Sequence, residues 1–258
     1  MIHSSDVIMH SPLEQFEIVS LIPFRIGSFD LSLTNTSLMM LRTASVIRAI
    51  TQTVLVSGNG LLVPSRMQVL LEGVHNMILS MLGQTIGSQG ASLFPFIFTV
   101  FTFVLGCNRF GLVPYSFTVT SHLIVTMTLA LAIWIGKLVI GFRLHGSTFF
   151  RILLPTGTPF MMIPFMVALE VMGFTITFIS LSVRLFANMM AGHILLKVIA
   201  GFAWTMMISG GMMWVLHVVP RTVLFLLLGL ETAVAFIQAY VFTLRTCIYV
   251  GDSLHGGH

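Results

Sequence analysis

The chain has 258 residues, of which 56% are hydrophobic and only 8% are charged. A soluble domain carries about 25% charged residues, so this composition excludes a soluble globular protein, and its abundant apolar residues exclude a disordered one. Lysine and arginine outnumber aspartate and glutamate by 12 to 8, but they are scattered singly, which argues against a nucleic-acid partner. The sequence predicts an integral membrane protein in contact with lipid, and its long apolar runs favour helices over a β-barrel.

The N-terminal quarter of the chain is more polar than the rest. Residues 1–30 form a mixed polar segment that holds four of the eight acidic residues. Residues 31–57 are long enough for a membrane span, which needs about 20 residues, but Arg42 and Arg48 interrupt them. A mid-membrane arginine costs on the order of 3 kcal/mol on insertion scales, so this segment is only a candidate first span.

In residues 66–86, apolar and polar positions alternate at helical spacing, which predicts an amphipathic helix in the membrane interface.

Two shorter spans are predicted next, over residues 93–112 and 118–140. The first is rich in phenylalanine, and four residues are expected to mark the turn near its end: Asn108, Arg109, Gly111 and Pro114. The second contains no charge before Lys137. We expect Lys137 and Arg143 to lie in the following connection, where their charges orient that side of the protein inward.

Residues 160–250 are predicted to form a hairpin of two long helices. No proline occurs between Pro164 and residue 200, and a helix of that length, about 54 Å, exceeds the ~30 Å hydrocarbon core. The helices must therefore tilt, bend or protrude, and they are joined near Gly210, Gly211 and Pro220. The predicted fold is all-α, a single membrane domain over residues 31–258 with about five transmembrane helices and one interfacial helix.

Ionisable residues inside the apolar helices are the candidate functional residues. A charge at that depth in the membrane is costly, so such residues usually have a function. Arg184 lies too far from a helix end to snorkel, although a structural pairing with Glu170 or Glu231 is an alternative role. Asn188 and Glu170 each fall about 40° from Arg184 on a helix. His193 falls about 180° from Arg184, so these two residues need not line the same aqueous path.

A second polar series occupies the last helix, where four residues recur every seven positions: Glu231, Gln238, Arg245 and Asp252. They share one helix face that drifts about 20° per step. This face is either a polar seam between helices or part of a proton path, since Glu231 and His193 can titrate near physiological pH. Small residues near both series suit internal packing or a smooth surface for a partner: Ala187, Ala191, Gly192, Ala233, Ala235 and Ala239.

Sequence motifs for nucleotide binding, for metal binding and for a catalytic nucleophile are absent. The nine histidines do not form the helical pairs of a haem-binding bundle. We therefore expect no cofactor and no metal, and no enzymatic activity of the chain by itself.

Five segments, in the same order along the chain, resemble the ATP synthase subunit a family of F-type enzymes in its mitochondrial and alphaproteobacterial form. They are residues 11–18, 114–122, 182–193, 201–206 and 238–242. The most specific is 182–193, which contains the family's R-L-x-x-N-M motif with Arg184 as its arginine. The resemblance covers most of the chain.

This resemblance implies a stator subunit in which proton flow drives the rotation of a ring of c subunits and so ATP synthesis. Arg184 would face the carboxylates of the ring and separate two aqueous half-channels. Four more residues match polar positions near this arginine in the family: Asn188, His193, Glu231 and Gln238. His193 and Glu231 would line the entry path from the intermembrane side, and Glu170 the exit path toward the matrix.

The implied partners are the c-subunit ring, the peripheral stalk and other Fo subunits, with F1 in indirect contact. The implied location is the mitochondrial inner membrane, with the bacterial plasma membrane as the alternative. An arginine suits the role because it is effectively never deprotonated and favours the ionised form of an arriving carboxylate. Two other functions are a stand-alone channel or secondary transporter, which would predict an internal repeat, and a structural anchor that moves no protons.

Overall fold

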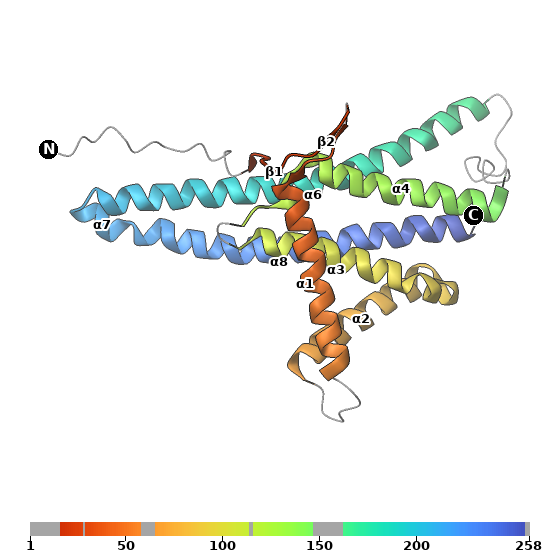
Figure 1. Cartoon of the computed structure of the whole chain (residues 1–258), viewed down its shortest axis with the longest axis horizontal. Helices are drawn as coiled ribbons and strands as arrows, with labels where there is room; N and C mark the ends of the chain where they lie inside the picture. The colour runs from red at the N-terminus through yellow and green to blue at the C-terminus, as the bar shows by residue number, and fades with distance from the viewer. Residues whose placement is uncertain (1–15, 28, 58–64, 114–115, 147–161, 256–258) are drawn as a thin grey trace.

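The computed structural model describes residues 16–27, 29–57, 65–113, 116–146 and 162–255. Over these residues the chain is almost entirely helical (Figure 1). The helices are α1 (Asn35–Ser57), α2 (Arg66–Thr85), α3 (Phe94–Gly111), α4 (Leu123–His145), α6 (Ile163–Ile208), α7 (Met212–Leu216) and α8 (Val218–His255). Two short 3-10 helices, η2 (Gly87–Leu93) and η3 (Val119–Ser121), precede α3 and α4. The predicted all-α class is confirmed.

Four helical stretches in the described part of the chain are long and apolar enough to cross a membrane. They are Gly90–Gly111, Leu123–Leu144, Ile163–Ile208 and Met212–Leu254. This confirms a helical membrane protein that ends in two long helices. Helix α1 has the length of a span, 23 residues, but it is not among the four, and its Arg42 and Arg48 are exposed. A membrane crossing by α1 therefore stays a prediction.

Helix α2 has the amphipathic character that its sequence predicts. It begins after Ser65, whose hydroxyl oxygen accepts a hydrogen bond from the backbone N–H of Gln68 at 3.3 Å, the usual role of a serine N-cap. One face buries Ile78, Met81 and Leu82 against the rest of the protein. The helix is not among the four candidate spans, which is consistent with a place in the membrane interface.

Short antiparallel strands precede α1, where a polar segment was predicted. Strand β1 (Ser20–Ile22) pairs with β4 (Leu33–Thr34), and β2 (Arg25–Ile26) pairs with β3 (Phe29–Asp30). Strands of two or three residues are too short to produce a recognisable alternation of apolar and polar residues. Most of the 11–18 segment that resembles the family lies outside the described residues.

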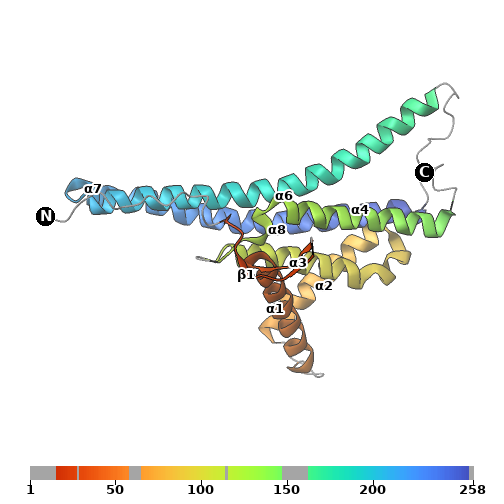
Figure 2. The same cartoon turned by 45° about the horizontal axis from the view of Figure 1, so that its top comes forward.

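Helices α6 and α8 form the predicted hairpin and lie side by side over much of their length (Figures 1 and 2). Helix α6 has 46 residues, which corresponds to about 69 Å. It ends before Gly210 and Gly211, whose φ angles of 68° and 61° are readily adopted only by glycine. Pro220 lies in the first turn of α8, where proline is tolerated. In both figures the N-terminal part of α6 diverges from α4 and α8.

The core forms where α2, α3, α4 and α8 meet the central part of α6. Its largest fully buried side chains include Phe101 and Ile78. Helix α1 crosses this bundle steeply (Figure 1) and touches α3 at Gly106. A Cβ at Gly106 would lie 2.9 Å from side-chain carbons of both Thr43 and Ile47. The glycine therefore permits the close approach of the two helices.

Polar residues that were predicted to mark turns lie inside helices. Asn108 and Arg109 belong to α3, which continues to Gly111. Lys137 and Arg143 belong to α4, which extends to His145. Asn108 and Lys137 are buried and find polar partners on α8, so neither needs a place in a solvated connection. Helix α4 begins at Leu123 and not at residue 118, because residues Val119–Ser121 form η3.

Candidate functional site

Glu231 of α8 and His193 of α6 lie together in the contact between the two long helices. His193 Nε2 is 3.9 Å from Glu231 Oε1, and only 15% and 6% of the two side chains are exposed. Thr118, which precedes η3, places its hydroxyl oxygen 3.2 Å from the same imidazole nitrogen. The structure thus brings together two of the predicted site residues and adds a threonine to which sequence analysis gave no role.

This arrangement suits proton transfer. Both carboxyl oxygens of Glu231 are buried and lack a hydrogen-bond partner among the described residues. The 3.9 Å separation from His193 is too long for a direct hydrogen bond but can be bridged by one water molecule. Imidazole and carboxyl groups can both take up and release protons, so the pair can form a two-step relay.

Gly192 makes room for the carboxyl group of Glu231. A Cβ at Gly192 would lie 2.5 Å from Glu231 Oε1 and 2.9 Å from its carboxyl carbon. Real Cβ atoms do not approach so closely, so an alanine at this position would displace Glu231. Gly192, one of the small residues for which packing and a partner surface were both open, therefore has a specific contact in the site.

His193 also lines a cavity. A cavity of about 740 Å³ lies between the end of α3, the segment after it, α6 and α8. Its polar lining includes His193, Lys197 and Ser116, and the rest is mostly apolar. Such a cavity is large enough for several water molecules, so it can connect the His193–Glu231 pair to an aqueous phase.

Asn108 of α3 is a buried polar residue that sequence analysis did not assign to the site. It is fully buried, and its side-chain amide donates a hydrogen bond of 3.2 Å to the carbonyl oxygen of Ala235. Ala235 lies one turn after Glu231 on α8, so Asn108 ties α3 to the segment that carries the carboxyl group. The sequence feature that could have identified Asn108 is its polar amide, which directly follows the apolar residues of α3.

Arg184 lies on another face of α6, as expected from its nine-residue offset from His193. Its side chain is exposed, whereas Leu185 and Met189 beside it are buried, with 3% and 1% exposure. Among the described residues, Arg184 has no hydrogen-bond or ion-pair partner. Asn188, one turn further along α6, is half-buried. The structure therefore does not bring Arg184 into contact with His193 or Glu231.

The small residues are divided between packing and exposure. Ala235 and Ala239 of α8 are fully buried in the bundle. Ala187 and Ala191 of α6 are exposed on the face that carries Arg184. Their short side chains leave the guanidinium group accessible. Internal packing is therefore the role of Ala235 and Ala239, whereas a smooth surface for a partner at Ala187 and Ala191 stays a prediction.

Gln238 and Glu170 are the other two predicted site residues, and they lie on α8 and α6. Gln238 is half-buried on α8, two turns after Glu231. Glu170 lies in α6, fourteen residues before Arg184, and its side chain is outside the described part of the structure. Its role stays a prediction that rests on helix geometry and on the family resemblance.

Comparison with known proteins relates this chain to a single family. The chain matches the family model described as "ATP synthase A chain" over residues 37–251. It is 46% identical to the ATP synthase subunit a of Chondrus crispus over 247 residues, which cover 96% of this chain and 97% of the relative. Its identity to the subunit a of Marchantia polymorpha is 46%, covering 95% and 98% of the two chains. For Brassica napus the identity is 43%, with 96% and 98% covered.

Proposed function

The chain belongs to the ATP synthase A chain family, and on that premise we propose that Arg184, His193 and Glu231 perform its proton transport. The family membership makes the chain the proton-translocating stator subunit of an F-type ATP synthase, a multi-pass membrane component of Fo. The nucleotide sites of the enzyme are in F1 and not in this subunit. The residue roles that follow are our proposal.

Protons enter through the cavity beside His193. Water in this cavity delivers a proton to the imidazole, and the imidazole passes a proton to Glu231 through one water molecule that bridges the 3.9 Å gap. Thr118, within hydrogen-bond distance of the same nitrogen, fixes the orientation of the ring. Glu231 then transfers the proton toward the surface of the hairpin. Asn188 and Gln238 supply neutral polar groups there.

Arg184 acts on the rotor. The observation that carries the proposal is that this guanidinium is exposed in an apolar helix, lacks a partner among the described residues, and lies beside Ala187 and Ala191. A buried partner within the chain would neutralise it, whereas an exposed guanidinium can meet the carboxylate of a moving c subunit. It stabilises the ionised carboxylate and prevents direct proton transfer between the two half-channels, because it keeps its own proton.

The remaining roles follow the family pattern. Glu170 lines the exit path toward the matrix, on the N-terminal side of Arg184. The partners are the c-subunit ring, the peripheral stalk and other Fo subunits, and F1 is reached indirectly. The mitochondrial inner membrane is the proposed location. Membership of the family, at identities above 40% over almost the whole chain, weighs against a stand-alone channel or transporter.

The test replaces Arg184 by glutamine in the assembled complex. We expect ATP-driven proton pumping to fall by at least about 100-fold, the usual loss when a preorganised charge stabiliser is removed. A native gel with mass spectrometry should show the complex and its c ring at normal levels. Arg221→Gln, which removes an exposed arginine of α8, is the matched control and should pump normally. Normal pumping in Arg184→Gln, or loss of assembly with normal flux per complex, would favour the structural anchor instead.

A further inference from the structure

Lys137 is a buried lysine in the interior of an apolar helix. It lies in α4, one residue after Gly136, and only 6% of it is exposed. Lysine is almost never fully buried without a partner, and its position well before the end of α4 at His145 does not allow its ammonium group to reach the end of the helix. Its surroundings therefore need a specific explanation, which the proton path through Glu231 does not provide.

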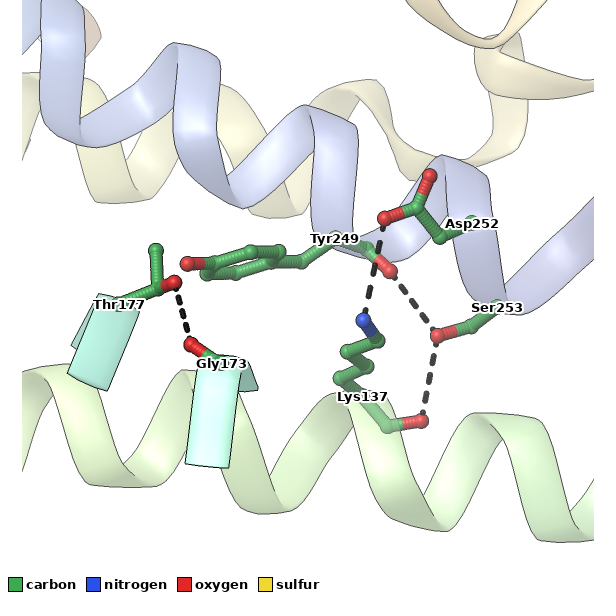
Figure 3. A network of polar contacts seen from close by, with 6 residues as sticks. All are labelled: Lys137, Gly173, Thr177, Tyr249, Asp252 and Ser253. Carbon is green, nitrogen blue, oxygen red and sulfur yellow. Dashed lines mark hydrogen bonds and ion pairs between the residues drawn. The ribbon is translucent and has the colours of Figure 1, made fainter. Parts of the chain in front are cut away.

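The ammonium group of Lys137 is held by two residues of α8 (Figure 3). Its Nζ atom lies 3.8 Å from Asp252 Oδ2 and 5.0 Å from the centroid of the Tyr249 ring, a distance typical of a cation–π contact. Ser253 donates a hydrogen bond of 3.4 Å to the backbone carbonyl of Lys137. The ammonium group of Lys137 is thus fixed to the last turns of α8.

Tyr249 extends this network to a third helix. The tyrosine is 8% exposed, and its hydroxyl group points toward the hydroxyl of Thr177 on α6 (Figure 3). Thr177 lies seven residues from both Glu170 and Arg184, so the three share a face of α6 that drifts about 20° per step. The network therefore meets α6 midway between Glu170, the proposed exit residue, and Arg184.

Asp252 is the outward-facing member of the network. Its side chain is 54% exposed, whereas that of Lys137 is only 7% exposed. Asp252 also ends the seven-residue series that begins at Glu231, about 31 Å away along α8, a distance comparable to the hydrocarbon thickness. The pair thus lies at the opposite end of the polar face from the His193 cluster.

Stability alone does not account for a buried charge at this position. Replacing a buried ion pair by apolar residues of similar volume is often neutral or stabilising, and α4 already packs through apolar residues such as Ala130 and Ile133. A pair of which one member is buried and the other is exposed instead fixes the position of the exposed group. In this network the exposed group is the carboxylate of Asp252.

We propose that Lys137 is a positioning residue for proton release: it fixes the Asp252 carboxylate and Tyr249 beside Thr177, at the junction of α4, α6 and α8. This inference rests on the proposed function, because it assigns the release end of the same proton path. Lys137 does not itself exchange protons. It acts through Asp252, so removing either member of the pair has the same consequence.

The experiment compares five variants in the full enzyme complex in membrane vesicles, by the rate of ATP-driven proton pumping per assembled complex. Lys137→Met, which keeps the side-chain length, should lower the rate about tenfold, within the usual range of coupling between paired residues. Lys137→Arg should restore most of the rate. Asp252→Asn should match Lys137→Met, and the double variant should be no slower than either single one. Arg143→Met, which removes an exposed positive charge from the same helix, should leave the rate unchanged.

Three results would overturn the inference. These are a normal rate in Lys137→Met, an equal loss in Lys137→Arg and Lys137→Met, and a double variant whose loss is the product of the single losses. If Lys137→Met does not assemble, Asp252→Asn decides alone, because its exposed side chain leaves the packing intact, and a normal rate there contradicts the proposal. Arg184→Gln, measured in parallel, separates the two proposals: if it pumps normally the proposed function fails, whatever the Lys137 variants do.

Discussion

Arg184 and His193 lie on the same helix, nine residues apart, and the fold surrounds them in opposite ways. His193 is enclosed by Thr118 and Glu231, at 3.2 and 3.9 Å. Arg184 is exposed and has no hydrogen-bond or ion-pair partner among the described residues. A relay needs donor and acceptor held at a fixed spacing, whereas a charge that meets a succession of rotor carboxylates must stay free of partners within its own subunit.

The difference shows which parts of the site the chain completes by itself. The His193–Glu231 relay is assembled within one subunit, so its geometry can be disturbed by changes in packing around it. In the proposed function, the c ring completes the surroundings of Arg184. Substitutions in the two regions should therefore fail in distinguishable ways, and the following experiments test this distinction.

The largest effect is expected from Arg184→Ala. Without the guanidinium, ATP-driven pumping should fall by at least about 100-fold. Passive proton flow through Fo should nevertheless persist, because a permanent positive charge no longer separates the half-channels. Pumping and passive flow can be measured in the same vesicles, before and after F1 is removed. A variant in which both flows stop would assign Arg184 to the proton path itself and remove the contrast with His193.

Glu231→Gln should come next, with proton flux reduced about 30-fold in both directions, somewhat below the usual contribution of a general acid or base. Glutamine keeps the volume and the polarity of the side chain but cannot exchange a proton. His193→Ala should give a loss of similar size, and the two together should be no worse than one, because they are consecutive steps of one relay. Flux is measured in the synthesis and hydrolysis directions. An unchanged rate in either direction would remove the residue from the path.

Gly192→Ala should give a smaller but specific loss, about tenfold. The added methyl group would lie 2.5 Å from Glu231 Oε1, so the carboxyl group at the end of this side chain must shift, which changes its 3.9 Å spacing from His193. Gly201→Ala is the matched control on the same helix, because a Cβ there meets no atom within 4 Å. Both variants are compared by pumping rate per assembled complex. Equal behaviour of the two would mean that Glu231 can move without loss of function.

The long elements of this fold could be predicted because their signals are continuous. Long apolar runs predicted the two C-terminal helices, and the Gly210–Gly211 pair predicted the position of their junction. Helix periodicity also predicted that Arg184 and His193 lie on opposite faces, since an offset of nine residues is two and a half turns on a straight helix. These inferences depend only on residues near one another in the chain.

Contacts between distant segments could not be predicted in the same way. Asn108 follows an apolar run, which is also where a turn would begin, and its partner Ala235 lies 127 residues away. Lys137 was assigned to a solvated connection for the same reason, although it pairs with Asp252. Thr118 carries no charge and occurs among other hydroxyl residues, so only the approach of α6 distinguishes it.

The smallest effect is expected from Asn108→Leu, which tests whether the α3–α8 tie supports the relay. The variant loses the hydrogen bond to Ala235, and such a bond contributes about 1 kcal/mol net, equivalent to about fivefold in rate. The loss is limited because leucine also removes Asn108 Oδ1, a buried acceptor with no partner among the described residues. Asn76→Leu, on the exposed part of α2, is the control.

Pumping rate per assembled complex again provides the measurement. A loss as large as that of Glu231→Gln would place Asn108 in the proton path itself. An unchanged rate would mean that the position of Glu231 is set by Gly192 and His193 alone. A loss of a few-fold would instead show that the enclosed half of the site depends on packing from a third helix, a dependence that the exposed Arg184 does not share.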